Sequence, residues 1–418
     1  MSEVTVEAEE YSFGLKMLDR LAGGVEGLGV GIGDLDPDRL LAKAQRRTRL
    51  RDFGDPSFEP YLRRLMEAAS SRPDLTSIGR VTLRQSALRA LANRLYVEQY
   101  FLDHPSVAQQ PIERPIFVLG FPRTGTTLLQ NLLRQPHERR ALQFWELTTP
   151  CPVHPDPETD RTKRIQSTDR MLAAAYLIAP EMGAVHEIRS TTAEECWPLF
   201  LSSFAVLNYD LQSGLRHYGD WLLGEADMVG PYRHYKRQLQ ILLHQRPVQN
   251  LVLKCPEHLW FLDSLLEVFP DACVVWTHRD PMDSVASYCS LISMSWRMLY
   301  GKFSAARIGT HIQHRFQEGV ERAMDARRRI NDESRFFDVP FSSLVKDPKG
   351  TVRRIHEHFD LRHGPEMDGL VDGWLQQRRA DKRGAHKYRA ERYGLEAEAL
   401  YSQFERYIRE FDIELRHR

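Results

Sequence analysis

The chain of 418 residues is long enough to bury a substantial hydrophobic core and to form more than one domain. Apolar residues make up 42% of it and charged residues 27%, the mix of an ordinary globular protein. Lys+Arg and Asp+Glu number 57 each, so the formal net charge is zero and no general attraction to nucleic acid or to an anionic membrane is expected. Any binding of anions must therefore depend on local clusters of basic residues.

The chain has five cysteines, an odd number at irregular spacing without a C-x-x-C pair. This pattern predicts neither a structural zinc site nor a disulfide framework, so we expect reduced thiols and no metal. The N-terminus is acidic and lacks the basic and apolar regions of a secretory signal. The longest apolar run, Met171 to Ala179, is much shorter than a membrane span. We therefore expect a cytoplasmic protein with no transmembrane segment. The cysteines are Cys151, Cys196, Cys255, Cys273 and Cys289.

The first part of the chain is predicted to be largely helical. Residues 22–34 are rich in glycine but contain no G-x-G-x-x-G, so we predict a flexible loop there rather than a dinucleotide-binding turn. From about residue 36 to 104, leucines recur at helical spacing between charged residues. We therefore divide the chain into a helical N-terminal extension, 1–110, and a domain that spans 111–418.

Beyond residue 110, short apolar segments alternate with helical ones. The first, Ile116–Leu119, is a continuous apolar run typical of a buried parallel strand, and a leucine-rich helix, Thr127–Arg134, follows it. This alternation predicts an α/β fold with a parallel β-sheet flanked by helices. Residues 155–247 are predicted to be mostly helical, and Leu395–Phe411 to be a packing helix. We expect further strands at Ala141–Leu147, Leu251–Lys254 and Cys273–Thr277, and a helix at Leu259–Phe269.

A phosphate-binding loop is predicted at Gly120–Thr127, G-F-P-R-T-G-T-T, between the first strand and the helix after it. In that position a Gly/Thr-rich turn aims several backbone N–H groups at one point, and the helix N-terminus adds partial positive charge. The spacing is close to that of a Walker A loop, but Thr126 stands where that loop needs a lysine. The loop therefore predicts a site for phosphate or sulfate whose cation is Arg123.

This loop resembles the one that binds the 5′-phosphosulfate in sulfotransferases that use 3′-phosphoadenosine 5′-phosphosulfate (PAPS). A second segment, H-R-D-P-M-D-S-V-A-S at 278–287, follows the fourth predicted strand and is similar to the family's 3′-phosphate site, with Arg279 and Ser287 in the positions of the phosphate ligands. Three further segments, R-D-F-G-D at 51–55, L-A-N-R at 91–94 and L-K-C-P-E-H-L at 253–259, are similar to a bacterial branch with a helical N-terminal extension.

The resemblance implies a P-loop-like fold, PAPS as co-substrate, and transfer of a sulfuryl group to a hydroxyl with release of the product PAP. It places the acceptor side in residues 155–247. Phe341 stands where many relatives have an adenine-contacting tyrosine, and the basic stretch 378–389 stands where relatives close a loop over the 3′-phosphate; a solvated charged face is the alternative there. The donor residues that it implies are Pro122, Arg123, Thr124, Gly125, Thr126, Thr127, Arg279, Ser287, Phe341, Arg383, His386 and Lys387.

Sulfuryl transfer is expected to resemble phosphoryl transfer, an in-line displacement with charge accumulating on the leaving oxygen. Arg123 can stabilise that charge but cannot act as an acid, because a guanidinium keeps its proton. Glu146, 23 residues after Arg123, is one candidate for the base that takes the acceptor's proton, with an exposed structural glutamate as the alternative. His258 is the other candidate, and Lys254 is expected to contact the sulfate of the donor. His186 and the pair Glu194–Glu195 are secondary candidates for the site, because lone residues of this kind are more often structural.

Aromatic residues in the helical middle of the chain favour a small apolar acceptor such as a hydroxylated lipid, phenol or polyketide, although such residues are often plain core. Two other functions stay open. A phosphotransferase would need the missing lysine and a magnesium-binding aspartate, and a non-catalytic nucleotide-binding protein would bind PAPS or PAP without turnover. The aromatic residues are Tyr176, Trp197, Phe200, Phe204 and Tyr209.

Overall fold

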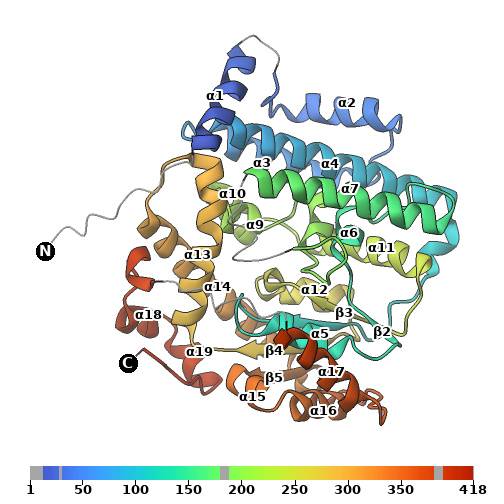
Figure 1. The fold of residues 1–418 in the computed structure, drawn as a ribbon, viewed down its shortest axis with the longest axis vertical. Helices are drawn as coiled ribbons and strands as arrows, with labels where there is room; N and C mark the ends of the chain where they lie inside the picture. Colours follow the sequence, from blue (N-terminus) through green and yellow to red (C-terminus); the bar gives the residue numbers. More distant parts are fainter. Residues whose placement is uncertain (1–12, 28–30, 179–187, 381–388, 418) are drawn as a thin grey trace, which may run out of the picture.

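The structure, a computed structural model, describes residues 13–27, 31–178, 188–380 and 389–417. Five parallel strands form one sheet in the order β2-β3-β1-β4-β5, so the chain leaves the central strand and returns on both sides of it. The predicted α/β fold with a parallel sheet covered by helices is confirmed (Figure 1). The strands are β1 (Ile116–Leu119), β2 (Arg139–Arg140), β3 (Asn250–Lys254), β4 (Cys273–His278) and β5 (Phe336–Pro340).

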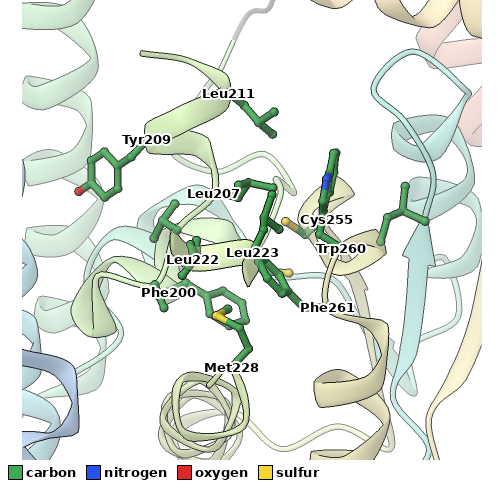
Figure 2. Packing of buried hydrophobic residues seen from close by; sticks show 14 of the residues in the cluster. Phe200, Leu207, Tyr209, Leu211, Leu222, Leu223, Met228, Cys255, Trp260 and Phe261 are labelled. Atoms are coloured by element: carbon green, nitrogen blue, oxygen red, sulfur yellow. The ribbon is translucent and has the colours of Figure 1, made fainter. Parts of the chain in front are cut away.

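The buried strands direct alternate side chains to two separate hydrophobic cores. In β1, Ile116 and Val118 face a core that contains α5 (Thr126–Leu133) and α16 (Pro348–His358). Phe117 and Leu119 face the larger core on the other side, part of which is shown in Figure 2. Because both faces of the sheet are covered, β1 is apolar throughout and every residue of β4 is buried.

The helices before the sheet form a layer above one of its faces (Figure 1). They share the larger hydrophobic core with β1 and with the helices between β2 and β3, so apolar contacts run continuously from this layer to the sheet. The division at residue 110 into two domains stays a prediction. These helices are α1 (Phe13–Gly27), α2 (Pro37–Thr48), α3 (Glu59–Ser70) and α4 (Ser77–Asp103), with the short 3₁₀ helices η1 (Pro56–Phe58) and η2 (Pro105–Gln109).

Residues 155–247 are mostly helical where the structure describes them, as predicted. Between β2 and β3 lie α6 (Phe144–Thr148), α7 (Pro157–Ile178), η3 (Trp197–Ser203), α9 (Asn208–Leu211), α10 (Arg216–Gly224) and α11 (Val229–Gln245). The remaining helices are η4 (Pro256–Leu259), α12 (Leu262–Val268), α13 (Pro281–Tyr300), α14 (Ala305–Ile330), η5 (Glu333–Arg335), α15 (Phe341–Lys346), α16, α17 (Met367–Ala380), η6 (Ala390–Tyr393), α18 (Ala397–Gln403) and α19 (Glu405–Glu410).

The strand predicted at Ala141–Leu147 is wrong. Strand β2 ends at Arg140, and Phe144–Thr148 is the helix α6. The carboxylate of Glu146 accepts the backbone N–H of Gln143 at 2.8 Å, which is half of a capping box and favours a helical turn. A short apolar run does not by itself distinguish a strand from a buried helix. Here the hydrogen bond from the Gln143 N–H to Glu146 favours the helix.

Three smaller predictions need correction. Residues 22–27 of the predicted glycine-rich loop belong to α1, which packs against α4, and 28–30 lie outside the described residues. The predicted C-terminal helix is two helices, α18 and α19, that meet at Phe404. The predicted helix Leu259–Phe269 is the turn η4 followed by α12. In addition, the sequence analysis does not predict the edge strand β5.

Over the part of the chain that the structure describes, no helix combines the length and the apolar character that crossing a membrane requires.

Candidate active site

The 120–127 loop leaves the central strand β1 in a conformation that only certain residues tolerate. Gly120 has φ 135°, and a Cβ placed there would lie 2.2 Å from Thr277 Oγ1 on β4. Thr124, fully buried, shares a hydrogen bond of 2.6 Å with the same Thr277 hydroxyl and donates to the carbonyl of Phe121 at 2.7 Å. The Thr124 side chain therefore anchors the loop to the sheet, and this loop begins the helix α5.

The 120–127 loop borders a cavity. Pro122, Arg123, Thr126 and Thr127 line a cavity of about 350 Å³, and α5 directs its first backbone N–H groups toward the same end of the sheet. Gly125, with φ 93°, passes beneath the ring of Phe341: an added Cβ would approach that ring to 3.1 Å. The predicted anion-binding loop and the predicted adenine-contacting residue are thus neighbours.

Lys254, at the end of the adjacent strand β3, points to the same loop. Its buried ammonium donates to Thr127 Oγ1 at 3.3 Å and to Glu195 Oε1 at 3.1 Å. Burial acts to lower the pKa of Lys254, but the charges of Glu195 and Glu194 outweigh burial and raise it. A charged ammonium therefore lies directly beside the phosphate-type loop.

Arg279 follows β4, on the other side of β1. Its guanidinium donates to Asp283 Oδ2 at 2.7 Å and to the backbone carbonyl of Arg123 at 2.8 Å, and it lies over the ring of Phe341 at 4.4 Å from the centroid. Ser287, two turns into α13, lines the cavity. The two sequence segments that carried the family resemblance therefore meet at the carboxyl ends of adjacent strands, where ligands of open α/β sheets bind.

The cavity extends from this loop into the helical layer and is mainly apolar. Its far walls come from α7, which contributes Met171, Leu172 and Ala175, and from α13, which contributes Leu291 and Ile292. Its polar lining includes Glu194, Glu195, Asn208, Gln212, Glu257 and Ser295.

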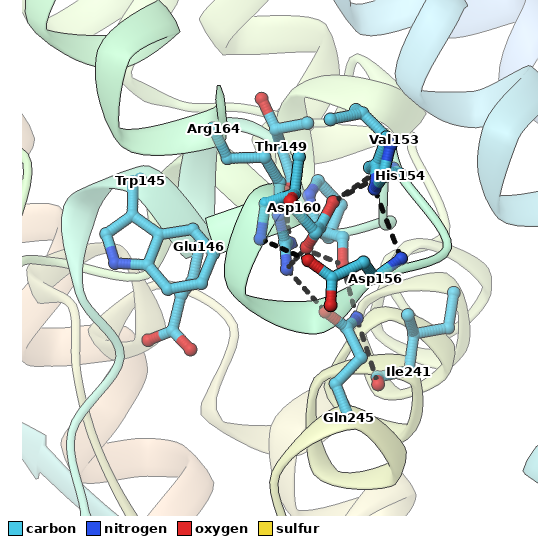
Figure 3. Close-up of polar contacts among 12 residues, drawn as sticks. Trp145, Glu146, Thr149, Val153, His154, Asp156, Asp160, Arg164, Ile241 and Gln245 are labelled. Carbon is cyan, nitrogen blue, oxygen red and sulfur yellow. Dashed lines mark hydrogen bonds and ion pairs between the residues drawn. The ribbon is translucent and has the colours of Figure 1, made fainter. Parts of the chain in front are cut away.

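The carboxylate of Glu146, the first candidate for a base, is hydrogen-bonded to groups outside the cavity. Besides accepting the Gln143 N–H, its carboxylate accepts from the buried guanidinium of Arg140 at 2.7 Å. Figure 3 shows it next to Trp145, whose ring lies 4.4 Å from the guanidinium carbon of Arg164. Glu146 is not among the residues that line the cavity. The geometry therefore gives this carboxylate a role in the structure of α6.

His258, the second candidate, lies behind the cavity wall. Its ring is fully buried and contacts the aromatic rings of Phe117, Phe200 and Tyr232, while its neighbours Pro256 and Glu257 line the cavity. Nδ1 is hydrogen-bonded to the Tyr232 hydroxyl at 2.7 Å and Nε2 lies 3.4 Å from Cys196 Sγ. Neither nitrogen is directed to the cavity.

Two carboxylates that line the cavity are not first choices from the sequence. The sequence makes Glu195 only a secondary candidate and does not distinguish Glu257, although both line the cavity and Glu195 binds Lys254 at the end of β3. The sequence feature that could have identified Glu257 is its position three residues after a strand-end lysine, within L-K-C-P-E-H-L. Glu195 precedes a 3₁₀ turn without any strand or helix pattern, so its proximity to Lys254 required the structure.

Glu257 gives the site a pH-dependent contribution to stability. Burial raises the pKa of its carboxyl to about 8, against the opposing effect of N–H bonds of 3.0 Å from Leu207 and Asn208. The folded protein therefore holds this proton up to about pH 8, whereas an unfolded chain loses it near pH 4.5, the ordinary pKa of a glutamate. The stabilisation is fully present below pH 4.5 and is lost as pH rises toward 8.

We expect the wild type, relative to Glu257→Gln, to lose up to about 1.4 kcal/mol of unfolding free energy per pH unit between pH 5.5 and 7.5. Urea unfolding of both proteins at these two pH values measures this difference. Any constant cost of the glutamine cancels in the comparison of slopes. Parallel pH profiles for the two proteins would show that Glu257 is ionised in the folded state.

The remaining sequence candidates fall into two groups. Arg383, His386, Lys387 and His186 lie outside the described residues. Of the aromatic residues, Trp197 lines the cavity, whereas Phe200, Phe204 and Tyr209 are buried in the larger core and the Tyr176 hydroxyl donates to the carbonyl of Ile188 at 2.8 Å.

Comparisons with known proteins identify the family to which the chain is similar. A model of the sulfotransferase family matches residues 115–365, which contain every strand of the sheet. The sulfotransferase STF9 from Mycobacterium avium superimposes with a TM-score of 0.81 at 32% identity over 91% of this chain and 98% of that one. The sulfotransferase STF1 from Mycobacterium tuberculosis H37Rv superimposes with a TM-score of 0.77 at 31% identity over 88% of this chain and 97% of that one.

A curated relative is the omega-hydroxy-beta-dihydromenaquinone-9 sulfotransferase Stf3 of Mycobacterium tuberculosis, 24% identical over 259 residues. That match covers 59% of this chain and 63% of the relative, so the chain spans less than two thirds of the relative's length. The family model covers more than half of the chain, and the two superimposed structures cover most of it. The chain belongs to the sulfotransferase family.

Proposed function

We propose that this protein is an enzyme that transfers the sulfuryl group of PAPS to a hydroxyl of a small, mainly apolar acceptor and releases PAP. The observation that carries the proposal is the convergence of Arg123, Lys254 and Arg279 at the ends of three adjacent strands. Arg123 and Lys254 are suited to the phosphosulfate, and Arg279 with Ser287 to a 3′-phosphate. A separate apolar cavity opens from the same loop and offers a place for a second substrate.

In the proposed reaction, the acceptor oxygen attacks the sulfur while the bond from sulfur to the bridging phosphate oxygen breaks. Negative charge grows on the leaving phosphate, where Arg123 and the N–H groups at the start of α5 stabilise it. Lys254 neutralises the transferring group and holds Thr127 in place. These cations supply the charge that the transfer needs, so we propose no metal in the reaction itself.

We propose Glu195 as the base that takes the proton of the acceptor hydroxyl. Its carboxylate lines the cavity and is hydrogen-bonded to Lys254, which in turn contacts the loop. The side chain keeps 27% of its surface exposed, so one oxygen remains accessible to an acceptor. Glu146 and His258 have their polar atoms engaged away from the cavity.

The acceptor class follows from the cavity. Its walls of methionine, leucine, isoleucine and tryptophan, with Glu195 and Lys254 beside the loop, suit an apolar molecule that presents one hydroxyl to Glu195. The name of the relative Stf3 describes such an acceptor, a hydroxylated menaquinone. We therefore propose a hydroxylated lipid, phenol or polyketide as acceptor, with no role for nucleic acid.

We also propose a cytoplasmic location. All five cysteines are buried free thiols, which suits a reducing compartment.

Calorimetric titration with PAP, ATP and AMP tests the proposal, followed by sulfuryl transfer from PAPS to a panel of hydroxylated lipids, phenols and sugars. We expect PAP to bind more tightly than AMP, ATP to bind poorly, and an apolar alcohol to be sulfated. Equal binding of ATP and PAP would favour a phosphotransferase. Tight PAP binding with no turnover of any acceptor would favour a nucleotide-binding protein without catalysis, and turnover of sugars alone would overturn the acceptor class.

A further inference from the structure

Two cysteines and a histidine, far apart in sequence, meet in the core beside the candidate site. Cys255 and His258 form a C-x-x-H pair on the turn η4, and Cys196 approaches from the start of η3. One ligand atom from each, the two Sγ atoms and a ring nitrogen of His258, lie within 4.8 Å of one another. The sequence did not reveal this group because only the fold brings Cys196 to the pair.

The spacing matches a tetrahedral zinc site. Zinc binds sulfur at about 2.3 Å and imidazole nitrogen at about 2.0–2.1 Å, so a sulfur and a nitrogen on one tetrahedral ion lie about 3.5 Å apart. Cys196 Sγ and His258 Nε2 are separated by 3.4 Å. The backbone fixes this approach, because the N–H of Cys196 donates to the carbonyl of Lys254 at 2.9 Å.

The groups around the cluster are those expected behind metal ligands. The Tyr232 hydroxyl is hydrogen-bonded to Nδ1 of His258 at 2.7 Å; when Nδ1 carries the proton of this bond, Nε2 has a free lone pair on the side of Cys196. The buried hydroxyl of Tyr235 has no hydrogen-bond partner. The Tyr235 ring lies 6.1 Å from the ring of His258, centroid to centroid, so this phenol stands beside the ligand atoms.

Charge also favours a divalent ion here. Two thiolates balance the charge of Zn²⁺, so a loaded site would be neutral overall and suited to an apolar core. The surroundings are apolar: Figure 2 shows the Cys255 side chain among residues that include Phe200, Leu207 and Trp260. Cys196, Cys255 and His258 are each at most 1% exposed.

We propose that Cys196, Cys255 and His258 bind one zinc ion as a structural site, with the Tyr235 hydroxyl as the fourth ligand. The ion would join the two segments that carry Glu195 and Lys254, since each of these residues is the immediate neighbour of a cysteine ligand. It would thereby fix the wall between the loop and the cavity. This site is separate from the reacting atoms, and the proposal is independent of the proposed function.

Metal analysis of the reduced, full-length protein tests the site. The protein is grown with zinc, purified with a phosphine reductant and passed through a chelator to remove loosely bound metal. We expect roughly one zinc per chain by mass spectrometry. Refolding with Co²⁺ instead should give the near-ultraviolet absorption of cobalt–thiolate bonds together with visible bands of tetrahedral cobalt.

Cys196→Ser and Cys255→Ser should each lower the zinc content at least tenfold, whereas Cys289→Ser, which removes an equally buried free thiol in α13, should retain it. The cobalt spectrum of the wild type keeps the test decisive even if a serine variant fails to fold. Wild-type protein that holds no zinc and shows no cobalt–thiolate absorption would overturn the proposal. Retention of the metal by a soluble, folded Cys196→Ser protein would do the same.

Discussion

Glu195→Gln is expected to lower kcat by about 10²–10⁴-fold, the usual contribution of a positioned general base. Glutamine keeps the size of the side chain and can still accept a hydrogen bond from Lys254, but it cannot take the acceptor's proton. PAP affinity should change little, since Glu195 faces the acceptor cavity. Steady-state kinetics over a range of pH, with PAP titration alongside, measure both quantities.

Glu146→Gln is the matched control. It removes a buried carboxylate that binds Arg140 and the backbone of Gln143, so it should lower the melting temperature and leave the kcat of the folded protein nearly unchanged. If Glu146→Gln abolishes turnover and Glu195→Gln does not, Glu146 is the base. In that case α6 would have to rearrange when substrates bind.

Arg279→Ala is expected to weaken PAP binding by about 10–150-fold, the equivalent of one charge-assisted hydrogen bond of about 1.5–3 kcal/mol. The guanidinium lies between the ring of Phe341 and the carboxylate of Asp283, which fixes its direction before a ligand arrives. Arg279→Lys should recover only part of the affinity, because an ammonium lacks the planar fork. Calorimetry with PAP measures both variants.

AMP, which has no 3′-phosphate, separates two explanations for such a loss. Arg279 also donates to the carbonyl of Arg123, so its removal could disturb the 120–127 loop. A disturbed loop would weaken AMP and PAP together, whereas loss of a 3′-phosphate contact would weaken PAP alone. Arg416→Ala removes a nearby arginine that is 44% exposed and should leave both affinities nearly unchanged. Unaltered PAP binding by Arg279→Ala would contradict the assignment of the 3′-phosphate site.

The positions of the 120–127 loop and of Arg279 at one edge of the sheet could be predicted from the sequence, because both follow strands in recognisable segments. Thr126, Thr127 and Arg279 are fixed by local patterns: an apolar run, a glycine turn, and a helix start. Parallel strands bring such segments to one edge of the sheet regardless of their distance along the chain. The fold class and the position of the loop followed from these rules.

The acceptor half could not be predicted in the same way. Glu195 lies outside any helix or strand, and its contact with Lys254 joins positions 59 residues apart. The error at Ala141–Leu147 had a related cause, because a carboxylate predicted to be a strand-end base closes a helical turn on its own backbone. Side-chain hydrogen bonds of this kind leave no periodic pattern in a sequence.

Because the cavity's outer wall belongs to α7 and its inner end to the sheet, the two halves of the site can evolve separately. Met171, Leu172 and Ala175 stand on a helix that supplies none of the three cations, so exchanging them reshapes the space for an acceptor without moving the strand ends. For the proposed enzyme, selection or directed evolution in the laboratory can therefore change the acceptor while the nucleotide site stays constant. Libraries confined to the cavity-facing positions of α7 are the natural starting point for such redesign.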